Sequence, residues 1–350
     1  MLSDNEIKEL VSEYGPRVNE GRTIKQIIAD NEIPKLAGAT VLEGKVSDSV
    51  FSDSLKTSAG VPIRLMFRGN RISTHDVNRG AIPFKDQVLA QNHDHMLNLV
   101  KDTLGSSQFE VEGLLPSSTV IPAENLKLLM VENVQRMYMA QSSTSTSLFQ
   151  HWLKAQEEGL SEFEYAGHEI EINSLSPNGK LPYLMDTPST KDKVDRTIDP
   201  PYLIENGVCT AGQYQQIRNA SIMAFGIVSQ YLREKGMVLV DTKTEHGVNT
   251  ANQIVAADEL YTMDSSRFWK LTEDGSVMER DGKPVSFSKE FARGMVKNTD
   301  MQFSTEQSNE IAVRYVVGLQ HLTGDAFEPD LRPRDQRIIE STNLILEALT

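Results

Sequence analysis

The sequence predicts an α+β protein with two lobes, and three observations lead to this class. The chain has 350 residues, about twice the length of a typical single domain. Short β-prone runs separated by turn residues begin near residue 39, for example at Thr40–Leu42, Val61–Phe67 and Phe109–Val111. Amphipathic helical patterns lie mostly outside these runs, so helices and antiparallel strands are segregated along the chain.

The order of the patterns suggests where the lobes begin and end. Residues up to about Asn31 form a helical preamble, because Leu2, Ile7 and Leu10 recur at helical spacing. Proline and serine at 116–122 are typical of a joint. We therefore predict a helical N-terminal extension at residues 1–36, a β-rich N-lobe at 37–122, and an α+β lobe with C-terminal helices at 123–350.

The second lobe begins with an apolar run that indicates a strand and ends with two helices. Thr210 and Gln213 have the spacing of a capping box that opens a helix up to Lys235. The other elements that we predict are a strand at Leu128–Tyr138, a loop or plain linker at Ser142–Ser147, mostly loop at Tyr165–Pro201, and helices at Glu306–Leu322 and Arg334–Leu349.

The composition excludes several classes of protein. With 39% hydrophobic and 24% charged residues, the chain has ample apolar content for a core. Its formal net charge of −14 disfavours nucleic acids and anionic lipids as partners, because like charges repel. Apolar runs such as Met237–Val240 are far shorter than the roughly 18 residues of a membrane span. We expect no nucleic-acid or membrane partner, although a local basic pocket for a small anion is compatible with this charge.

The cysteine content and the N-terminal residues indicate the cellular compartment in which the protein is expected. The single cysteine, Cys209, cannot form an internal disulfide, and the Cys and His residues lack zinc spacing. The segment Met1–Tyr14 lacks the basic region and apolar stretch of a signal peptide. We therefore expect a cytoplasmic protein, and the sequence leaves homo-oligomer formation open.

The most informative segment follows the long predicted helix. Residues 237–245 alternate as a strand, which places Asp241, Lys243 and Glu245 on one face. Turn residues and a second strand pattern follow, so a hairpin would bring Asp258 across from this row. Carboxylates beside a lysine could hold Mg²⁺, which is usually completed by substrate phosphates. The alternative is a solvated hairpin face with an internal ion pair.

Two further segments carry residue types that bind anions. The run Asp264-Ser265-Ser266-Arg267-Phe268-Trp269 combines hydroxyls with a guanidinium, which suits a clamp for phosphate or carboxylate. Near the front, Gly44-Lys45 could bring the backbone and an ammonium close to phosphates. This pair is also compatible with an ordinary turn, since the glycine spacing and Val46 do not fit a Walker A loop.

Together these segments resemble SAICAR synthetase, the purine-biosynthesis ligase family of phosphoribosylaminoimidazole-succinocarboxamide synthases, from about Val41 to Ala326. The most specific matches are Asp-Thr-Lys-x-Glu-x-Gly at 241–247 and Asp-Glu…Asp-Ser-Ser-Arg-Phe-Trp at 258–269. Supporting matches are Gly44-Lys45-Val46, Arg71-Ile72-Ser73 with Asp76, Ile82-Pro83-x-Lys85, Glu132-x-x-x-Arg136, Thr187-Pro188-Ser189-Thr190-Lys191 and Lys289-x-Phe291-x-Arg293.

The resemblance implies an ATP-dependent ligase of de novo purine biosynthesis. Its substrates would be carboxyaminoimidazole ribonucleotide (CAIR), L-aspartate and ATP, and its products SAICAR, ADP and phosphate, formed through an acyl phosphate. It also implies Mg²⁺ and a two-lobed fold, with a kinase-like β-rich N-lobe, a larger α+β lobe, and ATP in the cleft between them.

The resemblance also assigns roles to residues. The implied catalytic residues are Lys45, Lys243, Glu245 and Asp258. Glu245 and Asp258 would hold the metal, and the nucleotide would contact these two residues and Gly44, Lys45 and Lys191. Among the implied substrate-binding residues, Arg136, Ser142 and Arg267 would hold the phosphate and carboxylate of the ribonucleotide. The full set is Arg71, Ser73, Lys85, Arg136, Ser142, Asp264, Ser266, Arg267, Lys289 and Arg293.

Several positions depart from the family pattern, mostly around the substrate pocket. They include Asn70, His75, Gln141 and Val194. Two alternatives therefore stay open. One is a related ATP-dependent carboxylate–amine ligase or phosphotransferase with a different substrate, and the other is a non-catalytic paralogue that binds nucleotide.

Overall fold

A computed structural model of the chain describes residues 1–44, 46–74, 77–191, 196–296 and 301–350. The structure divides into two compact units, each assembled from segments that are distant in the sequence. The first unit comprises Met1–His95, Ser107–Asn125 and Ser288–Thr350, and the second comprises Met96–Ser106 and Leu126–Phe287. Helices combine with antiparallel sheets in both units, which confirms the predicted α+β class.

The three predicted domain ranges stay predictions. The two compact units have different boundaries from these ranges, because each unit combines segments that are distant in the sequence. The helices before residue 40 and those after residue 288 belong to the same unit as the β-rich segment. The longer segment of the second unit begins at Leu126, close to the joint that we expected at 116–122, and the chain returns to the first unit at Ser288.

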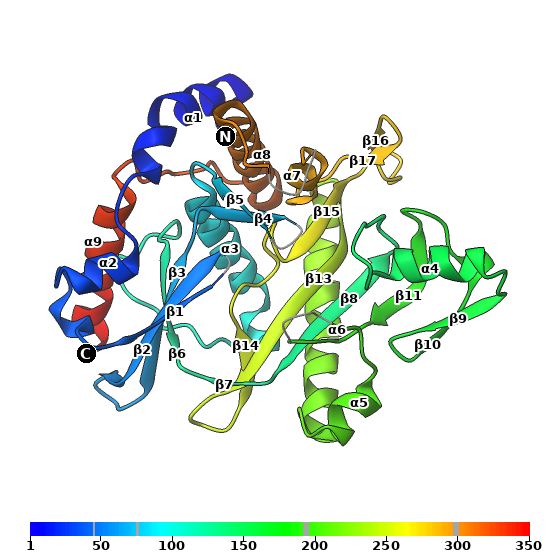
Figure 1. The fold of residues 1–350 in the computed structure, drawn as a ribbon, viewed down its shortest axis with the longest axis horizontal. Helices are drawn as coiled ribbons and strands as arrows, with labels where there is room; N and C mark the ends of the chain where they lie inside the picture. The colour runs from blue at the N-terminus through cyan, green and yellow to red at the C-terminus, as the bar shows by residue number, and fades with distance from the viewer. Residues whose placement is uncertain (45, 75–76, 192–195, 297–300) are drawn as a thin grey trace. The chain divides into compact units, whose positions relative to one another are not determined.

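The first unit is built on a four-stranded antiparallel sheet in the order β1-β2-β3-β6 (Figure 1). Pro122 lies on the edge strand of this sheet, where a missing backbone donor is tolerated. The strands of this unit are β1 (Thr40–Glu43), β2 (Ser47–Lys56), β3 (Pro62–Arg68), the small hairpin β4 (Arg71–Thr74) and β5 (Val77–Ala81), and β6 (Val120–Glu124).

The predicted strand at Phe109–Val111 is wrong. These residues run beside the sheet, and the Phe109 N–H donates to the carbonyl of Pro122 over 3.0 Å. Their side chains pack against the core of the first unit instead of extending the ladder. Phe109 and Val111 are thus partly buried in a loop, and β-propensity does not distinguish a packed loop from a strand.

Helices cover the sheet of the first unit. Their N-caps follow from sequence: Ser3 with Glu6 and Thr23 with Gln26 form complete capping boxes. The core brings residues such as Ile27 and Ile345 against Leu65 of the sheet. The predicted helical preamble and both predicted C-terminal helices are confirmed. The helices of this unit are α1 (Asp4–Asn19), α2 (Ile24–Ala29), the 3-10 turn η1 (Pro34–Leu36), α3 (Lys85–Leu104), α7 (Glu290–Gly294), α8 (Thr305–Thr323) and α9 (Arg334–Leu349). The C-terminal part of α3 belongs to the second unit.

The second unit is organised around the long strand β13, which pairs with β7, β8, β14 and β15 (Figure 1). All of these ladders are antiparallel. The strands are β7 (Lys127–Leu128), β8 (Val131–Tyr138), β9 (Glu162–Tyr165), β10 (His168–Glu171), β11 (Lys180–Asp186), β12 (Ser189–Thr190), β13 (Met237–Val248), β14 (Ile254–Ala257), β15 (Ser266–Lys270), β16 (Glu279–Arg280) and β17 (Lys283–Pro284).

The sequence patterns predicted the long helix of this unit but not all strands of its sheet. The Thr210–Gln213 capping box is present and opens the predicted long helix, α6. The expectation of mostly loop at 165–201 is wrong in part, because β11 pairs with β8 and buries Leu181 and Met185. Pairing with a neighbouring strand overrides the Pro and Gly content there. The helices are α4 (Leu148–Glu157), η2 (Ile172–Ser174), α5 (Pro200–Glu205) and α6 (Ala211–Glu234). In the part of the chain that the structure describes, no helix is both long and apolar enough to cross a membrane.

A polar layer is buried on the side of β13 opposite the row that carries Glu245. His246 is 2% exposed, and its Nε2 has no hydrogen-bond partner among the described residues. Burial lowers the pKa of His246 to about 4, because charging an imidazole away from water is costly. In the folded protein this histidine is therefore neutral at pH 7.

We predict that His246 makes the protein less stable in mild acid. Its pKa is about 4 in the folded state and about 6.5 in the unfolded state, so unfolding takes up a proton between these values. Stability is complete above pH 6.5 and falls by about 2 kcal/mol by pH 5. Urea unfolding at pH 7.5 and 5 measures this difference. His246→Gln should flatten the pH dependence, whereas the exposed His321→Gln should leave it unchanged; equal slopes in all three proteins would contradict the prediction.

Candidate functional site

The predicted hairpin of β13 and β14 is present. Glu245 pairs with Ala257 in the antiparallel ladder, and Asp258 follows directly with a φ of 58°. Aspartate tolerates this left-handed conformation better than most residues. Asp258 is exposed, whereas the side chain of Glu245 is 10% exposed. The two carboxylates predicted to share a metal thus lie at the same end of one hairpin.

A chain of alternating charges surrounds Glu245. Its Oε2 is ion-paired with Lys191, and its Oε1 lies 3.5 Å from the Nζ of Lys243. Lys243 also donates to Glu132. Burial disfavours the charged ammonium, but Glu132 and Glu245 outweigh burial and raise the pKa of Lys243 above its ordinary value. Lys243 therefore stays a cation, as its proposed role in a phosphate-handling site requires.

A second cluster places one carboxylate between two arginines. Asp241 pairs in register with Arg136 on β8 and with Arg267 on β15. Its Oδ2 accepts from Arg136 Nη1 over 3.2 Å, and its Oδ1 accepts from Arg267 Nε over 3.0 Å. The two guanidinium groups are therefore held at a fixed spacing, on the two strands that flank β13.

Both arginines are mostly buried, and one has an unused donor. Their side chains are each 17% exposed. Arg136 also donates from Nε to Thr187 over 3.0 Å. Arg267 Nη1 is buried without a hydrogen-bond partner among the described residues. A buried guanidinium nitrogen without a partner is unusual, so this donor of Arg267 is unused within the described residues.

Ser142 lies in the expected loop after β8. Its Oγ accepts the N–H of Thr144 over 3.2 Å, and its carbonyl accepts from Gln150 over 2.8 Å. Because the hydroxyl acts as an acceptor toward Thr144, its own hydrogen stays available for donation. The interpretation of 142–147 as a loop is confirmed.

Two predicted site residues on the 264–267 segment differ in position. Arg267 points to the Asp241 carboxylate, whereas Ser266 is 4% exposed and its hydroxyl pairs with Thr242 Oγ1 at 2.8 Å. Alternation along β15 thus places Ser266 on the opposite face from Arg267, which corrects its placement with the clamp. Asp264 lies in the turn before β15, where its N–H donates to Thr262 over 3.3 Å.

The first unit contains the other predicted positions. Lys45, His75 and Asp76 lie outside the described residues. Gly44 is required by its turn, since a Cβ there would lie 2.3 Å from the carbonyl oxygen of Ser47. Arg71 donates to Asp48 over 2.7 Å and to the Gly44 carbonyl over 3.1 Å. The turn before Lys45 is therefore fixed by an ion pair.

The remaining predicted positions of this unit are spread over other elements. Ser73 lies on β4 opposite Asn78. Lys85 is fully buried, with its ammonium 5.7 Å from the ring centroid of Tyr315. Lys289 lies next to α7, and Arg293 within α7 pairs with Glu290 at 2.8 Å. The burial of Lys85 favours a structural role over substrate contact.

Sequence reasoning left two central residues out of the predicted site. Asp241 was recognised only as part of the strand row, and Glu132 only as a motif match. Both became central because β8, β13 and β15 lie in register, which a single strand pattern cannot indicate. The signal that could have found them was the strand spacing that puts Glu132 and Arg136 on one face of β8, and Asp241 and Lys243 on one face of β13.

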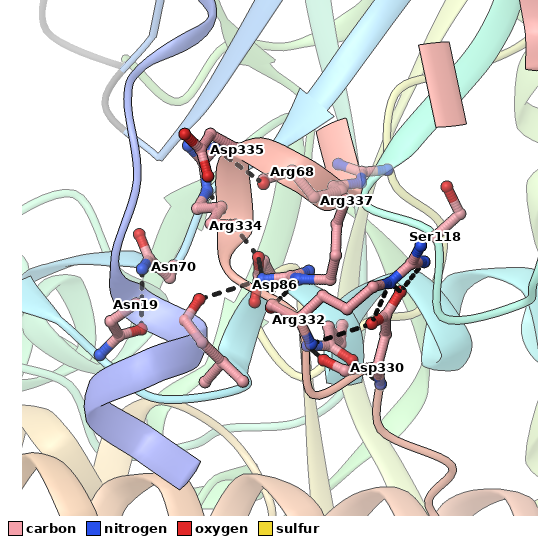
Figure 2. Close-up of polar contacts among 12 residues, drawn as sticks. Asn19, Arg68, Asn70, Asp86, Ser118, Asp330, Arg332, Arg334, Asp335 and Arg337 are labelled. Atoms are coloured by element: carbon pink, nitrogen blue, oxygen red, sulfur yellow. Dashed lines mark hydrogen bonds and ion pairs between the residues drawn. The ribbon is translucent and has the colours of Figure 1, made fainter. Parts of the chain in front are cut away.

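Two of the family departures have structural partners. The Asn70 side chain donates to the Asn19 side chain at the end of α1 over 2.8 Å (Figure 2). An aspartate at 70 could not make this donation, so the change matches the N-terminal helix. The Gln141 N–H donates to the Asn178 side chain over 3.0 Å. Val194 lies outside the described residues.

Comparisons with known proteins agree with this arrangement. A family model described as SAICAR synthetase matches residues 42–310. The chain is 28% identical over 316 residues to a putative phosphoribosylaminoimidazole-succinocarboxamide synthase 2 of Mesorhizobium japonicum, covering 87% of this chain and 94% of that protein. It is 28% identical over 295 residues to the chloroplastic synthase of Arabidopsis thaliana, covering 80% and 68%.

Solved structures share the fold. A SAICAR synthase from Saccharomyces cerevisiae complexed with SAICAR superposes with a TM-score of 0.66 at 21% identity, over 83% of this chain and 97% of that one. A SAICAR synthetase in complex with ADP gives a TM-score of 0.59 at 19% identity, over 83% and 100%. At this identity the likeness establishes the fold.

We predict that Asp241→Asn destabilises the protein strongly. Removing one partner of a buried ion pair leaves uncompensated charge, which costs about 3 kcal/mol, and here two guanidinium groups lose the same partner. Urea unfolding monitored by tryptophan fluorescence measures the loss. The exposed ion pair Lys154–Glu158 provides the control, since Glu158→Gln should change stability by less than about 1 kcal/mol. A similar small effect for Asp241→Asn would contradict a structural dependence on this carboxylate.

Proposed function

Because this chain belongs to the SAICAR synthetase family, we infer that it is a phosphoribosylaminoimidazole-succinocarboxamide synthase. It is an ATP-dependent ligase that joins CAIR to L-aspartate and gives SAICAR, ADP and phosphate. The match of the family model over 42–310 carries this conclusion. The paired arginines around Asp241 support it, because the reaction needs an anion clamp.

The arginine clamp would hold the ribonucleotide. Arg136 and Arg267 already share Asp241, which fixes their separation while leaving Arg267 Nη1 without a partner among the described residues. A planar guanidinium binds phosphate and carboxylate through two parallel donors. The Ser142 hydroxyl would add a third donor. We propose that these residues hold the phosphate and carboxylate of CAIR, with Asp264 at the edge of the same site.

The donor set at the β13–β14 hairpin fits Mg²⁺. Among the described residues no three His, Cys, Asp or Glu side chains converge as a complete metal site. Glu245 and Asp258 offer two carboxylates, which is the usual protein share for a Mg²⁺ that keeps water and phosphate ligands. We propose that these two residues hold Mg²⁺ with the nucleotide. When bound, the ion supplies charge neutralisation on the transferring phosphoryl group.

The protein's own residues would then position and shield the reaction. A carboxylate is a poor electrophile, so phosphorylation of the CAIR carboxylate precedes attack by the aspartate amine. Lys243, kept cationic by Glu132 and Glu245, would stabilise charge on the phosphates, and Lys191 would contact the nucleotide beside it. Stabilisation by fixed charges is usually the largest contribution of such a site.

The first unit contains a candidate phosphate-binding turn. The close approach at Gly44 and the Arg71–Asp48 pair hold this turn in shape, and we propose that Lys45 follows as a counter-charge to ATP. Arg71, Ser73, Lys289 and Arg293 stay predicted substrate contacts. A cytoplasmic location, homo-oligomer formation and the cleft position of ATP likewise stay predictions.

A coupled assay tests the function directly. The protein is incubated with ATP, Mg²⁺, L-aspartate and CAIR, and ADP and SAICAR are quantified. Formation of both in equal amounts supports the proposal. ADP without SAICAR, or a different amide product formed only with another amine or carboxylate, would instead favour the related ligase or phosphotransferase that the departures at Asn70 and Gln141 left open.

We predict that Glu245→Gln lowers turnover by orders of magnitude and raises the Mg²⁺ concentration for half-maximal rate at least tenfold. The change removes a metal ligand but keeps the size of the side chain. Initial rates across a Mg²⁺ titration measure it. Glu132→Gln is the matched control, since it removes another carboxylate beside Lys243 that is not proposed to bind metal. Equal shifts in both variants would assign the effect to the lysine network.

We predict that Arg267→Lys raises the KM for CAIR more than tenfold and changes the KM for ATP by less than about twofold. Lysine keeps the charge but loses the two-pronged geometry. Steady-state kinetics with each substrate varied in turn measure the split. Arg280→Lys, on an exposed strand of the same unit, should behave as wild type. Equal effects of Arg267→Lys on both substrates would indicate only a structural ion pair with Asp241.

A further inference from the structure

Tyr165, at the end of β9, links the arginine clamp to the loop at 142–147 in the second unit. The tyrosine is 2% exposed and belongs to a core cluster that also contains Met139 and Met185. Met185 pairs in register with Arg136 of the clamp. Because side chains in a packed core have little freedom to move, this environment fixes where the Tyr165 hydroxyl lies.

The hydroxyl of Tyr165 holds the loop that carries Ser142. It donates to the carbonyl of Thr146 over 3.1 Å. The same carbonyl accepts from Thr197 Oγ1 over 3.1 Å, so two hydroxyls from distant segments bind one backbone oxygen. At the other end of the loop, the carbonyl of Ser142 accepts from Gln150 over 2.8 Å. The loop lies outside any strand, and these side-chain donors therefore hold it at both ends.

The same tyrosine also interacts with Arg136. Burial disfavours the charged guanidinium, but Tyr165 and Asp241 outweigh burial and raise the pKa of Arg136 above its ordinary value. A neutral phenol can stabilise this cation because its oxygen accepts a hydrogen bond while its own hydrogen is donated elsewhere. Arg136 thus has three partners, which are Thr187, Asp241 and Tyr165. Of these three, Tyr165 is the one that also bonds to the 142–147 loop.

A tyrosine that bonds both groups restrains them relative to each other. An anion held by a guanidinium and a hydroxyl needs both donors at hydrogen-bond distance at once, and a displacement of about 1 Å is costly. We propose that Tyr165 is a positioning residue for the ribonucleotide. Its hydroxyl holds Arg136 and the 142–147 loop at the separation that lets Arg136 and Ser142 bind one anionic group. This inference rests on the function proposed above.

Tyr165→Phe tests this role, because it removes the hydroxyl and keeps the ring in the core. The Thr146 carbonyl keeps its second donor, Thr197, so the fold should be retained. We expect the KM for CAIR to rise about tenfold, as for the loss of a hydrogen bond to a charged group. The KM for ATP should change by less than about twofold, and turnover at saturating CAIR should recover, since weaker substrate binding alone leaves kcat unchanged.

Two control variants separate this bridge from the general loss of a hydroxyl. Tyr183→Phe removes another tyrosine hydroxyl of the same unit, one that bonds to His168, and should keep the wild-type KM values. Thr197→Val removes the other donor to the Thr146 carbonyl but keeps the Tyr165 hydroxyl, so its KM for CAIR should rise by less than about threefold. Equal increases in Thr197→Val and Tyr165→Phe would overturn the link to Arg136, because the effect would then pass through the loop alone.

Calorimetry without ATP separates this role from the proposed function. CAIR is titrated into the wild-type protein and into Tyr165→Phe, and the melting temperature of each is recorded. Affinity about tenfold weaker in the variant, at an unchanged melting temperature, supports the positioning role. Equal affinity in both proteins, or a loss of affinity that is matched for ATP and accompanied by a lower melting temperature, would overturn this role and leave the ligase function standing. Absence of CAIR binding by the wild type would overturn the proposed function, and the positioning role with it.

Discussion

The shared carboxylate of Asp241 is the interaction on which the second unit's site depends. Three adjacent strands place Arg136, Asp241 and Arg267 side by side, and two cations so close would repel each other without the anion between them. The carboxylate uses one oxygen for each arginine. It therefore fixes both guanidinium groups in the folded protein, so the cost of organising the proposed anion clamp would be met during folding.

The charged residues around Glu245 are arranged differently from the Asp241 cluster, as a chain and not around one shared carboxylate. Lys191, Glu245, Lys243 and Glu132 form a chain of alternating sign along adjacent strands. Each carboxylate is compensated in the structure described here, so no isolated charge is buried. In the site that we propose, Glu245 would take up a metal ion with the nucleotide, and its lysine partners would transfer their interaction to the incoming phosphates. The same residues thus satisfy both folding and the proposed chemistry.

The first unit shows how segments outside the family match are joined to it. α1 and α9 lie outside residues 42–310, yet both bind to residues within it. Asn19 accepts from Asn70, and Arg337 reaches Asp86 at the start of α3 (Figure 2). Burial lowers the pKa of Arg334 despite the proximity of Asp86. The C-terminal helix therefore brings buried positive charge to the family fold.

The sequence by itself determined the α+β class, the major helices and the chemical character of the site. Capping boxes such as that at Thr210 and periodic apolar positions act over a few residues, so they can be recognised locally. The hairpin that joins Glu245 and Asp258 was also predictable, because its two strands are close in sequence. Only the tertiary structure decided that Asp241 lies between Arg136 and Arg267, that β11 is a strand, and that Ser266 lies on the opposite face from Arg267. These features depend on register between strands that can lie 105 residues apart in sequence, and register is set by packing and pairing that no local pattern contains.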